Sequence, residues 1–150
     1  MWDGGGGGFG AGQYYAHPQN KFWRTLYAVG LTPRLFLPAE FALLDGLGIG
    51  LTDIAKHVSG MDAQLPRGSL GAAAVAELRA RIALYAPTIL AFTSLTGGRR
   101  VMGGDAVFGR QRAKIGGTEV WILPSPSPAA HWNWDETHWH ALARRVAQLP

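Results

Sequence analysis

The side chains best suited to chemistry lie in two short tracts near opposite ends of the chain. The first tract, residues 14–23, reads YYAHPQNKFW and sets aromatic rings, a histidine and an amide around one proline. The second, residues 124–132, reads PSPSPAAHW and holds the hydroxyls of Ser125 and Ser127 between prolines. Proline fixes its own φ, so this backbone is stiff and loses little entropy on binding. Rigid hydroxyls suit contacts with phosphate oxygens. A strand-to-helix linker stiffened by proline is the simpler alternative.

The first tract divides into residues that pack and residues that could bind. Phe22 and Trp23 follow helical spacing and are expected in the core, with Asn20 as the helix N-cap. Tyr15 precedes the turn that contains His17. A flat aromatic ring on such a turn is either a stacking platform for a nucleobase or a plain packing residue.

The residue types and their spacing argue against several other kinds of site. The chain has no cysteine, which excludes disulfides, thiolate metal sites and cysteine nucleophiles. His138 and His140 are two residues apart and would not face each other on a helix, so no metal site is predicted. No G-x-S-x-G elbow is present for a serine hydrolase. The glycines at 4–8 lack the preceding strand and the lysine of a phosphate-binding loop.

The hydrophobic pattern predicts the elements that must position these tracts. Strands are expected over 88–93 and 119–123, because both are unbroken β-rich runs. Residues 48–53 are expected to form a short buried stretch, and a glycine- and arginine-rich stretch for which no element is predicted spans 97–117. Four helices are expected, and the first two cover 20–30 and 38–45. The third runs from its cap Ser69 to the residue before Pro87, and its apolar stripe is Gly71, Val75, Leu78, Ile82 and Tyr85. The fourth lies at the C-terminus and carries Trp139, Leu142, Val146 and Leu149.

Alternating helices and strands predict a three-layer α/β/α fold with a small, mainly parallel central sheet. In such sheets ligands bind beyond the carboxyl ends of the strands. The loops after Thr93 and Leu123 both fall there, so topology alone places the second tract at a functional edge.

Composition bounds the class of protein and its partners. The chain has 150 residues, 47% hydrophobic and 16% charged, which is typical of one folded domain. Residues 1–12 are glycine-rich and expected to be poorly ordered, and 13–150 are expected to form the domain. No apolar run approaches the ~20 residues of a membrane span, and no signal peptide is evident.

The charge of the chain favours an anionic partner. The net charge is +4 and the pI about 9.9, which makes nucleic acid the first candidate. One glycine-rich segment is either a solvated loop or a phosphate-contacting surface, and it concentrates Arg99, Arg100, Arg110, Arg112 and Lys114.

The two tracts, taken together with GLTP at 30–33 and GIGLTDIAK at 48–56, resemble the mismatch-specific uracil/thymine-DNA glycosylase family. Its members carry an [aromatic]-A-x-P-x-N-x-F-W segment and an x-P-[S/N]-x-S motif before the last helix, and the resemblance covers roughly residues 13–148. It implies a uracil-DNA glycosylase-like fold and a monofunctional DNA-repair enzyme. Such an enzyme flips uracil or mispaired thymine out of DNA and hydrolyses its N-glycosidic bond with a directly attacking water. It implies no cofactor, a DNA partner containing uracil or a mismatched base, a monomer, and a cytoplasmic, nucleoid-associated location in a bacterium.

The resemblance also implies roles for individual residues. Tyr15 matches the aromatic residue that stacks on the flipped base, His17 and Asn20 lie in the same pocket-wall segment, and Ser94 stands at the position of base-edge contacts. The second tract matches the phosphate-gripping motif at Ser125 and Ser127 and the wedge that fills the base stack at Pro128, Ala129, Ala130 and His131. Because this wedge is small, weaker reading of the opposite base is expected, or use of His131 or Trp132 as the plug.

The N-terminus departs from the family pattern. Members open with a strand that feeds a G-x-[N/D]-P-G loop, whose polar side chain orients the attacking water, and we expect that first strand to be missing here. Counting back from Tyr15 at the family spacing reaches Asp3, whose carboxylate could orient the water and stabilise an oxocarbenium-like transition state. The main alternative is a catalytically impaired nucleic-acid-binding domain of the same fold. A small-molecule α/β domain unrelated to DNA is a third.

Overall fold

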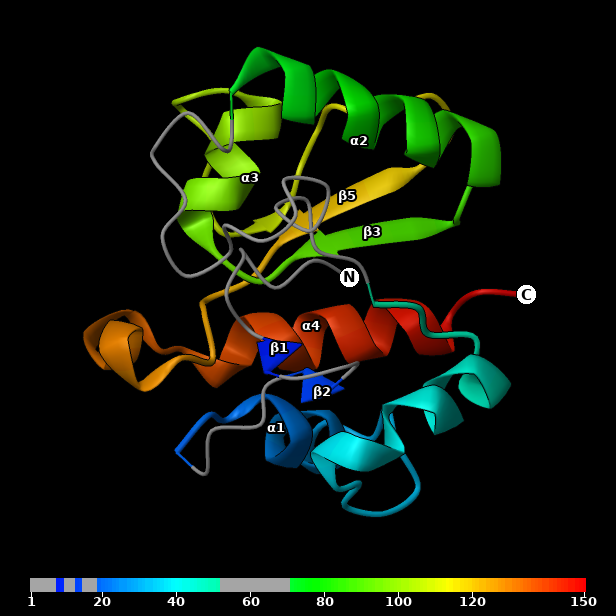
Figure 1. Ribbon diagram of the computed structural model, residues 1–150, viewed down its shortest axis with the longest axis vertical. Helices are drawn as coiled ribbons and strands as arrows, with labels where there is room; N and C mark the ends of the chain where they lie inside the picture. Colours follow the sequence, from blue (N-terminus) through cyan, green and yellow to red (C-terminus); the bar gives the residue numbers. More distant parts are fainter. Residues whose placement is uncertain (1–7, 10–12, 15–18, 52–70) are drawn as a thin grey trace. The chain divides into compact units, whose positions relative to one another are not determined.

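Figure 1 shows the computed structural model of the chain, which describes residues 8–9, 13–14, 19–51 and 71–150. Contacts divide the chain into two compact units. The first contains Leu51–Leu123, and the second contains Gly7–Gly50 with Pro124–Pro150. The predicted α/β class with a small, mainly parallel sheet is confirmed. The predicted division at residue 13 stays a prediction.

The first unit is built on a three-stranded sheet in the order β3-β5-β4. Strand β3 spans Ile89–Phe92, β4 spans Gly109–Arg110, and β5 spans Glu119–Ile122. Strands β3 and β5 pair in parallel from Ile89 opposite Glu119, whereas the shorter β4 pairs with β5 antiparallel. Both long strands were predicted to within one residue, because continuous apolar runs suit a strand buried on both faces.

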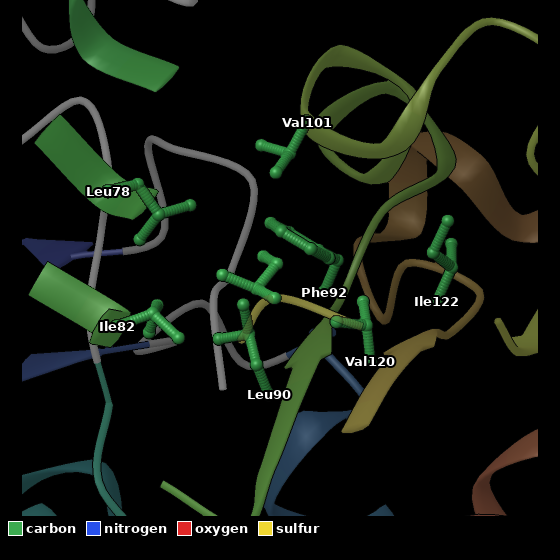
Figure 2. Close-up of a cluster of buried hydrophobic side chains, with 8 residues drawn as sticks. Leu78, Ile82, Leu90, Phe92, Val101, Val120 and Ile122 are labelled. Atoms are coloured by element: carbon green, nitrogen blue, oxygen red, sulfur yellow. The ribbon is translucent and has the colours of Figure 1, made fainter. Parts of the chain in front are cut away.

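Two helices cover one face of this sheet and enclose the core of the first unit. Helix α2 spans Ala72–Tyr85 and α3 spans Leu95–Met102. Alternate strand residues point toward these helices, as expected from the two-residue repeat of a strand. The buried cluster in Figure 2 contains Leu78, Ile82, Leu90, Phe92, Val101, Val120 and Ile122.

The predicted stripe of α2 is right for Val75, Leu78 and Ile82, which belong to the core cluster or pack against it, but wrong for Tyr85. Leu78 and Ile82 are buried, but Tyr85 is 74% exposed. Tyr85 lies in the last turn of the helix, and Ala86 follows it in the left-handed region with φ of 47°. The predicted cap, Ser69, lies outside the described residues, and the helix begins after Gly71.

Helix α3 was not expected, because its sequence, LTGGRRVM, contains two adjacent glycines that disfavour a helix. Its geometry explains the glycine at 98. A Cβ built there would lie 2.4 Å from Cδ1 and 2.5 Å from Cγ1 of the buried Ile122. The missing side chain therefore lets α3 approach β5 closely. The helix is also capped, since Ser94 Oγ accepts a hydrogen bond from the N–H of Gly97 at 3.1 Å.

The second unit contains most of the helices that the pattern predicted. Helix α1 spans Phe22–Ala28 and α4 spans Glu136–Ala147. Two segments are 3-10 helices, η1 over Pro38–Leu47 and η5 over Pro128–Asn133. Strand β1, Gly8–Phe9, pairs antiparallel with β2, Gln13–Tyr14. The fully buried core side chains of this unit are Phe22, Leu26, Leu44, Trp139 and Leu142.

Some details of the second unit differ from prediction. The segment at 38–45 is helical but of the tighter 3-10 kind and extends to Leu47. In the described part of 48–53 no residue is buried, because Gly48 ends η1 in the left-handed region and the chain then runs at the surface. Val146 is partly exposed and Leu149 lies beyond the end of α4.

A bidentate ion pair fixes the chain before η1. Arg34 Nη1 and Nη2 donate to the two carboxylate oxygens of Glu40 at 3.1 and 2.7 Å, and the N–H of Leu37 donates to Oε1 of Glu40 at 2.8 Å. The guanidinium of Arg34 also lies 4.8 Å from the ring centroid of Phe36. The hydrogen bonds from Arg34, followed by that from Leu37, lower the pKa of Glu40 from 4.5 to about 2.

This ion pair predicts an acid-sensitive contribution to stability. Because the pKa of Glu40 is lowered in the folded state, the contribution is complete above about pH 4.5 and is lost as the pH falls toward 2. Thermal unfolding of the wild type and of Glu40→Gln should therefore differ at neutral pH and converge on acidification. A difference in melting temperature that stays constant across this range would contradict the prediction.

Candidate functional site

The predicted site residues fall into described and undescribed groups. Asp3, Tyr15 and His17 lie outside the described residues. The structure places Asn20 at the start of α1 and Ser94 at the N-cap of α3, two residues after the end of β3. The remaining predicted residues follow β5 in the second tract and are Ser125, Ser127, Ala129, Ala130 and His131.

The two tracts that the sequence singled out are joined by a backbone hydrogen bond. The N–H of Lys21 donates to the carbonyl of Pro126 at 2.9 Å. The ammonium of Lys21 lies 5.4 Å from the ring centroid of Trp134, which follows the second tract. A cation over an aromatic ring at this distance is attracted to it. The start of α1 and the PSPSP segment therefore form one local structure within the second unit.

Trp139 of α4 supports this junction from the core. Its indole Nε1 donates to the carbonyl of Pro124 at 3.1 Å. Its ring packs edge-on against Phe22 with centroids 6.1 Å apart, and the ring of Trp134 lies 6.0 Å away. One buried indole thus holds the first residue of the second tract and the first residue of α1. Lys21, Trp134 and Trp139 were not predicted to position the site, because their contacts join segments far apart in the sequence.

The side chain of Asn20 forms a hydrogen bond with the first residue of α1. Its Oδ1 accepts a hydrogen bond from the N–H of Phe22 at 2.9 Å. The capping position itself is one residue later than predicted, at Lys21. Among the described residues the side-chain amide nitrogen of Asn20 donates to no acceptor. This half-buried group can therefore donate to a ligand.

The serines of the second tract form two successive turns. Ser125 Oγ accepts a hydrogen bond from the N–H of Ser127, and Ser127 Oγ accepts one from the N–H of Ala129, both at 3.2 Å. A hydroxyl that accepts still has its own hydrogen to donate. Ser125 and Ser127 are half-buried, and the neighbouring Pro124 and Pro126 are largely enclosed. The turns thus orient both hydroxyls and leave each one a donor.

The 3-10 helix η5 presents small residues followed by two rings. Ala129 and His131 are exposed, and Ala130 is half-buried. His131 Nδ1 lies 3.2 Å from the carbonyl of Pro128, and its ring meets Trp132 edge-on with centroids 5.0 Å apart. The indole of Trp132 is 73% exposed.

Ser94 lies at the carboxyl edge of the sheet in the first unit. The N–H of Leu123 donates to the carbonyl of Phe92 at 2.7 Å, so β3 and β5 end at the same edge. Ser94 Oγ caps α3 and retains its hydrogen as a donor. This is the edge at which parallel sheets bind ligands.

The C-terminal histidines pair along their own helix. His138 Nε2 lies 3.8 Å from Asp135 Oδ2, and His140 Nε2 lies 4.0 Å from Glu136 Oε1. Hydrogen bonds from the side chain and backbone of Thr137 lower the pKa of Asp135. Within the described ranges no three side chains of metal-binding type come together. No described helix is long and apolar enough to cross a membrane.

The chain matches the sequence model of a known family. The sequence model described as the uracil DNA glycosylase superfamily matches residues 7–145. The matched range contains both tracts, the sheet and helices α1 to α3 with most of α4.

Proposed function

The chain belongs to the uracil DNA glycosylase superfamily, and we propose that it is a monofunctional DNA-repair glycosylase of its mismatch-specific uracil/thymine class. In this proposal the protein acts as a monomer, flips uracil or a mispaired thymine out of DNA, and hydrolyses the N-glycosidic bond without a cofactor. The observation that carries the proposal is the hydrogen bond from Lys21 to the carbonyl of Pro126. It joins the tract suited to a base with the tract suited to phosphates.

The base would be held by the first tract. Tyr15 would stack on the flipped base, and His17 would line the same wall. The amide of Asn20, oriented through its bond to Phe22, could donate to a carbonyl oxygen of the base. Ser94 would contact the base edge with its hydroxyl. Flipping costs a few kcal/mol, and less at a mismatch, which is one source of selectivity.

The DNA backbone would be held by the second tract. Ser125 and Ser127 each have an oriented hydroxyl that can donate to a phosphate oxygen. Ala129, Ala130 and His131 would occupy the gap left in the base stack. Since the alanines are small, the exposed ring of Trp132 would complete the plug.

The attacking water would be oriented by Asp3. In the proposed step the water oxygen bonds to C1′ of the sugar while the glycosidic bond breaks and the base leaves with the bonding electrons. The carboxylate would accept the water proton and stabilise positive charge on the sugar. Placement matters here, because a misplacement of ~1 Å can cost about 10²-fold in rate.

A cleavage assay tests the proposal. The protein is incubated with labelled duplexes containing uracil opposite guanine, uracil opposite adenine, or thymine opposite guanine, and alkali then breaks the strand at abasic sites. We expect cleavage of the mismatched uracil duplex that Asp3→Asn abolishes. Binding without cleavage would overturn the proposal in favour of an inactive nucleic-acid-binding domain of the same fold.

Tyr15→Ala should lower the excision rate about 10- to 100-fold, since stacking on one base is worth about 1–3 kcal/mol. Tyr15→Phe keeps the ring and should retain most of the activity. Excision kinetics and thermal unfolding are measured on the same preparations. A large fall in melting temperature for Tyr15→Ala, with unchanged excision at a temperature where it is folded, would mark the residue as core.

A further inference from the structure

The hairpin formed by β4 and β5 in the first unit carries a cluster of cations that the proposed site does not use. The hairpin is anchored at its base by Gln111, whose N–H donates to the carbonyl of Val120 at 2.8 Å. The side-chain amide of Gln111 also donates to the carbonyls of Val107 and Gly109 at 2.6 and 2.9 Å. These hydrogen bonds of Gln111 therefore hold the chain both before β4 and directly after it.

The hairpin is anchored again near its tip. Ile115 and Thr118 exchange two backbone hydrogen bonds, at 3.1 and 2.9 Å, and the side chain of Ile115 is buried. Between these two anchors the first side of the hairpin contains three residues, 112–114, whereas the second side contains only Glu119. The excess residues form a bulge, and bulges redirect side chains out of a strand. Residues 112–114 are all exposed.

The bulge presents two cations without partners among the described residues, and a third cation beside it is paired with a carboxylate. Among the described residues neither Arg112 nor Lys114 makes a hydrogen bond or an ion pair. Arg110 enters the bulge with its Nε held 2.9 Å from Oε1 of Glu119, and its side chain is half exposed. The buried Glu119 is held in turn by the indole of Trp121, whose Nε1 donates to Oε1 at 2.9 Å. Arg110 is thus oriented by a buried carboxylate through its Nε, which leaves its terminal nitrogens at the half-exposed end of the side chain.

The charge is concentrated in this part of the protein. Residues 71–123 contain seven arginines and lysines against three acidic residues, whereas 19–50 and 124–150 together contain five against four. Arg110, Arg112 and Lys114 occupy alternate positions along the chain, which bends at residues 112 and 113 and so spreads them over less than the ~13 Å that an extended strand would span. A group of cations along one short segment suits the repeated negative charges of a phosphate backbone.

We infer that the bulge with Arg110, Arg112 and Lys114 is a second contact surface for the phosphate backbone of duplex DNA. The inference rests on the proposed function for the identity of the polyanion. It adds a contact outside the base pocket and the serine tract. Because the hairpin is anchored at both ends, the cations lose little backbone freedom on binding. They contact phosphates and so contribute affinity without reading sequence.

The test measures the salt dependence of binding to an undamaged labelled duplex by fluorescence anisotropy. Removal of one cation that contacts a phosphate should lower the slope of log affinity against log salt by about 0.9. We expect this fall for Arg112→Gln and for Lys114→Gln, and about twice the fall for the double variant. Arg112→Lys should retain most of the slope. Arg144→Gln is the matched control, because Arg144 is a cation at the surface of α4 without a described partner.

Excision of uracil by the same proteins separates the two proposals. A reduced slope in a protein that never excises uracil would support the bulge contact and overturn the glycosylase. Normal excision by the wild type with unchanged slopes in both bulge variants would overturn the bulge contact alone. An equal fall for Arg144→Gln would also overturn it, because the effect would then follow net charge and not position.

Discussion

Replacement of Trp139 by alanine should lower the free energy of unfolding by about 3–5 kcal/mol, the range found for large aromatic residues removed from cores. The side chain is fully buried and packs against Phe22 and Trp134. Its removal would leave a cavity beneath the second tract and would take the indole donor away from the carbonyl of Pro124. Chemical denaturation monitored by circular dichroism measures the change.

Two further variants separate the packing of Trp139 from its hydrogen bond. Trp139→Phe keeps much of the volume but leaves the buried carbonyl of Pro124 without this donor, which should cost about 1–3 kcal/mol. Trp132→Ala is the surface control and should change stability by no more than about 0.5 kcal/mol. Equal destabilisation by Trp132→Ala and Trp139→Ala would show that Trp139 is not a core anchor of this unit.

Replacement of Lys21 by proline should reduce uracil excision at least about tenfold, because it removes the N–H that joins the two tracts. The carbonyl of Pro126 would be left without its donor, and an unsatisfied buried acceptor costs about 1–3 kcal/mol. Lys21 has φ of −87°, close enough to the range of proline that the ring itself should introduce little strain at this residue. Excision is measured at a temperature where the variant is folded.

Lys21→Gln is the matched control for the proline variant. It removes the charge and the contact with Trp134 but keeps the backbone donor. We expect it to retain excision within about fivefold of the wild type, since a cation over a ring near the surface is worth about 0.5–1 kcal/mol. If Lys21→Pro excises uracil at the wild-type rate, the bond to Pro126 does not position the site.

Local patterns were sufficient wherever one segment carried its own signal. The β-rich runs at 88–93 and 119–123 predicted the parallel strands, and helical spacing after Asn20 predicted α1. The resemblance carried by the two tracts also predicted a uracil-DNA glycosylase. The family match over residues 7–145 supports that interpretation at the level of the superfamily.

Patterns failed where the outcome depended on a neighbour distant in sequence. The two glycines of α3 argue against a helix locally, but at 98 the space that a side chain would need is filled by Ile122. The glycine is therefore a packing residue, and only the position of β5 reveals it. Arg112 and Lys114 likewise look like loop residues until the pairing on either side shows that they bulge from an anchored hairpin.

By itself the sequence determined the class of the fold and the places of most of its strands and helices, and it predicted the two tracts proposed for the site, because each depends on short-range periodicity or residue type. The tertiary structure decided that the N–H of Lys21 reaches the carbonyl of Pro126, that Trp139 holds Pro124, and that Glu119 orients Arg110. The first two contacts close long loops, and the third crosses a hairpin. Their formation depends on the packed cores that bring the segments together, and no local pattern encodes it.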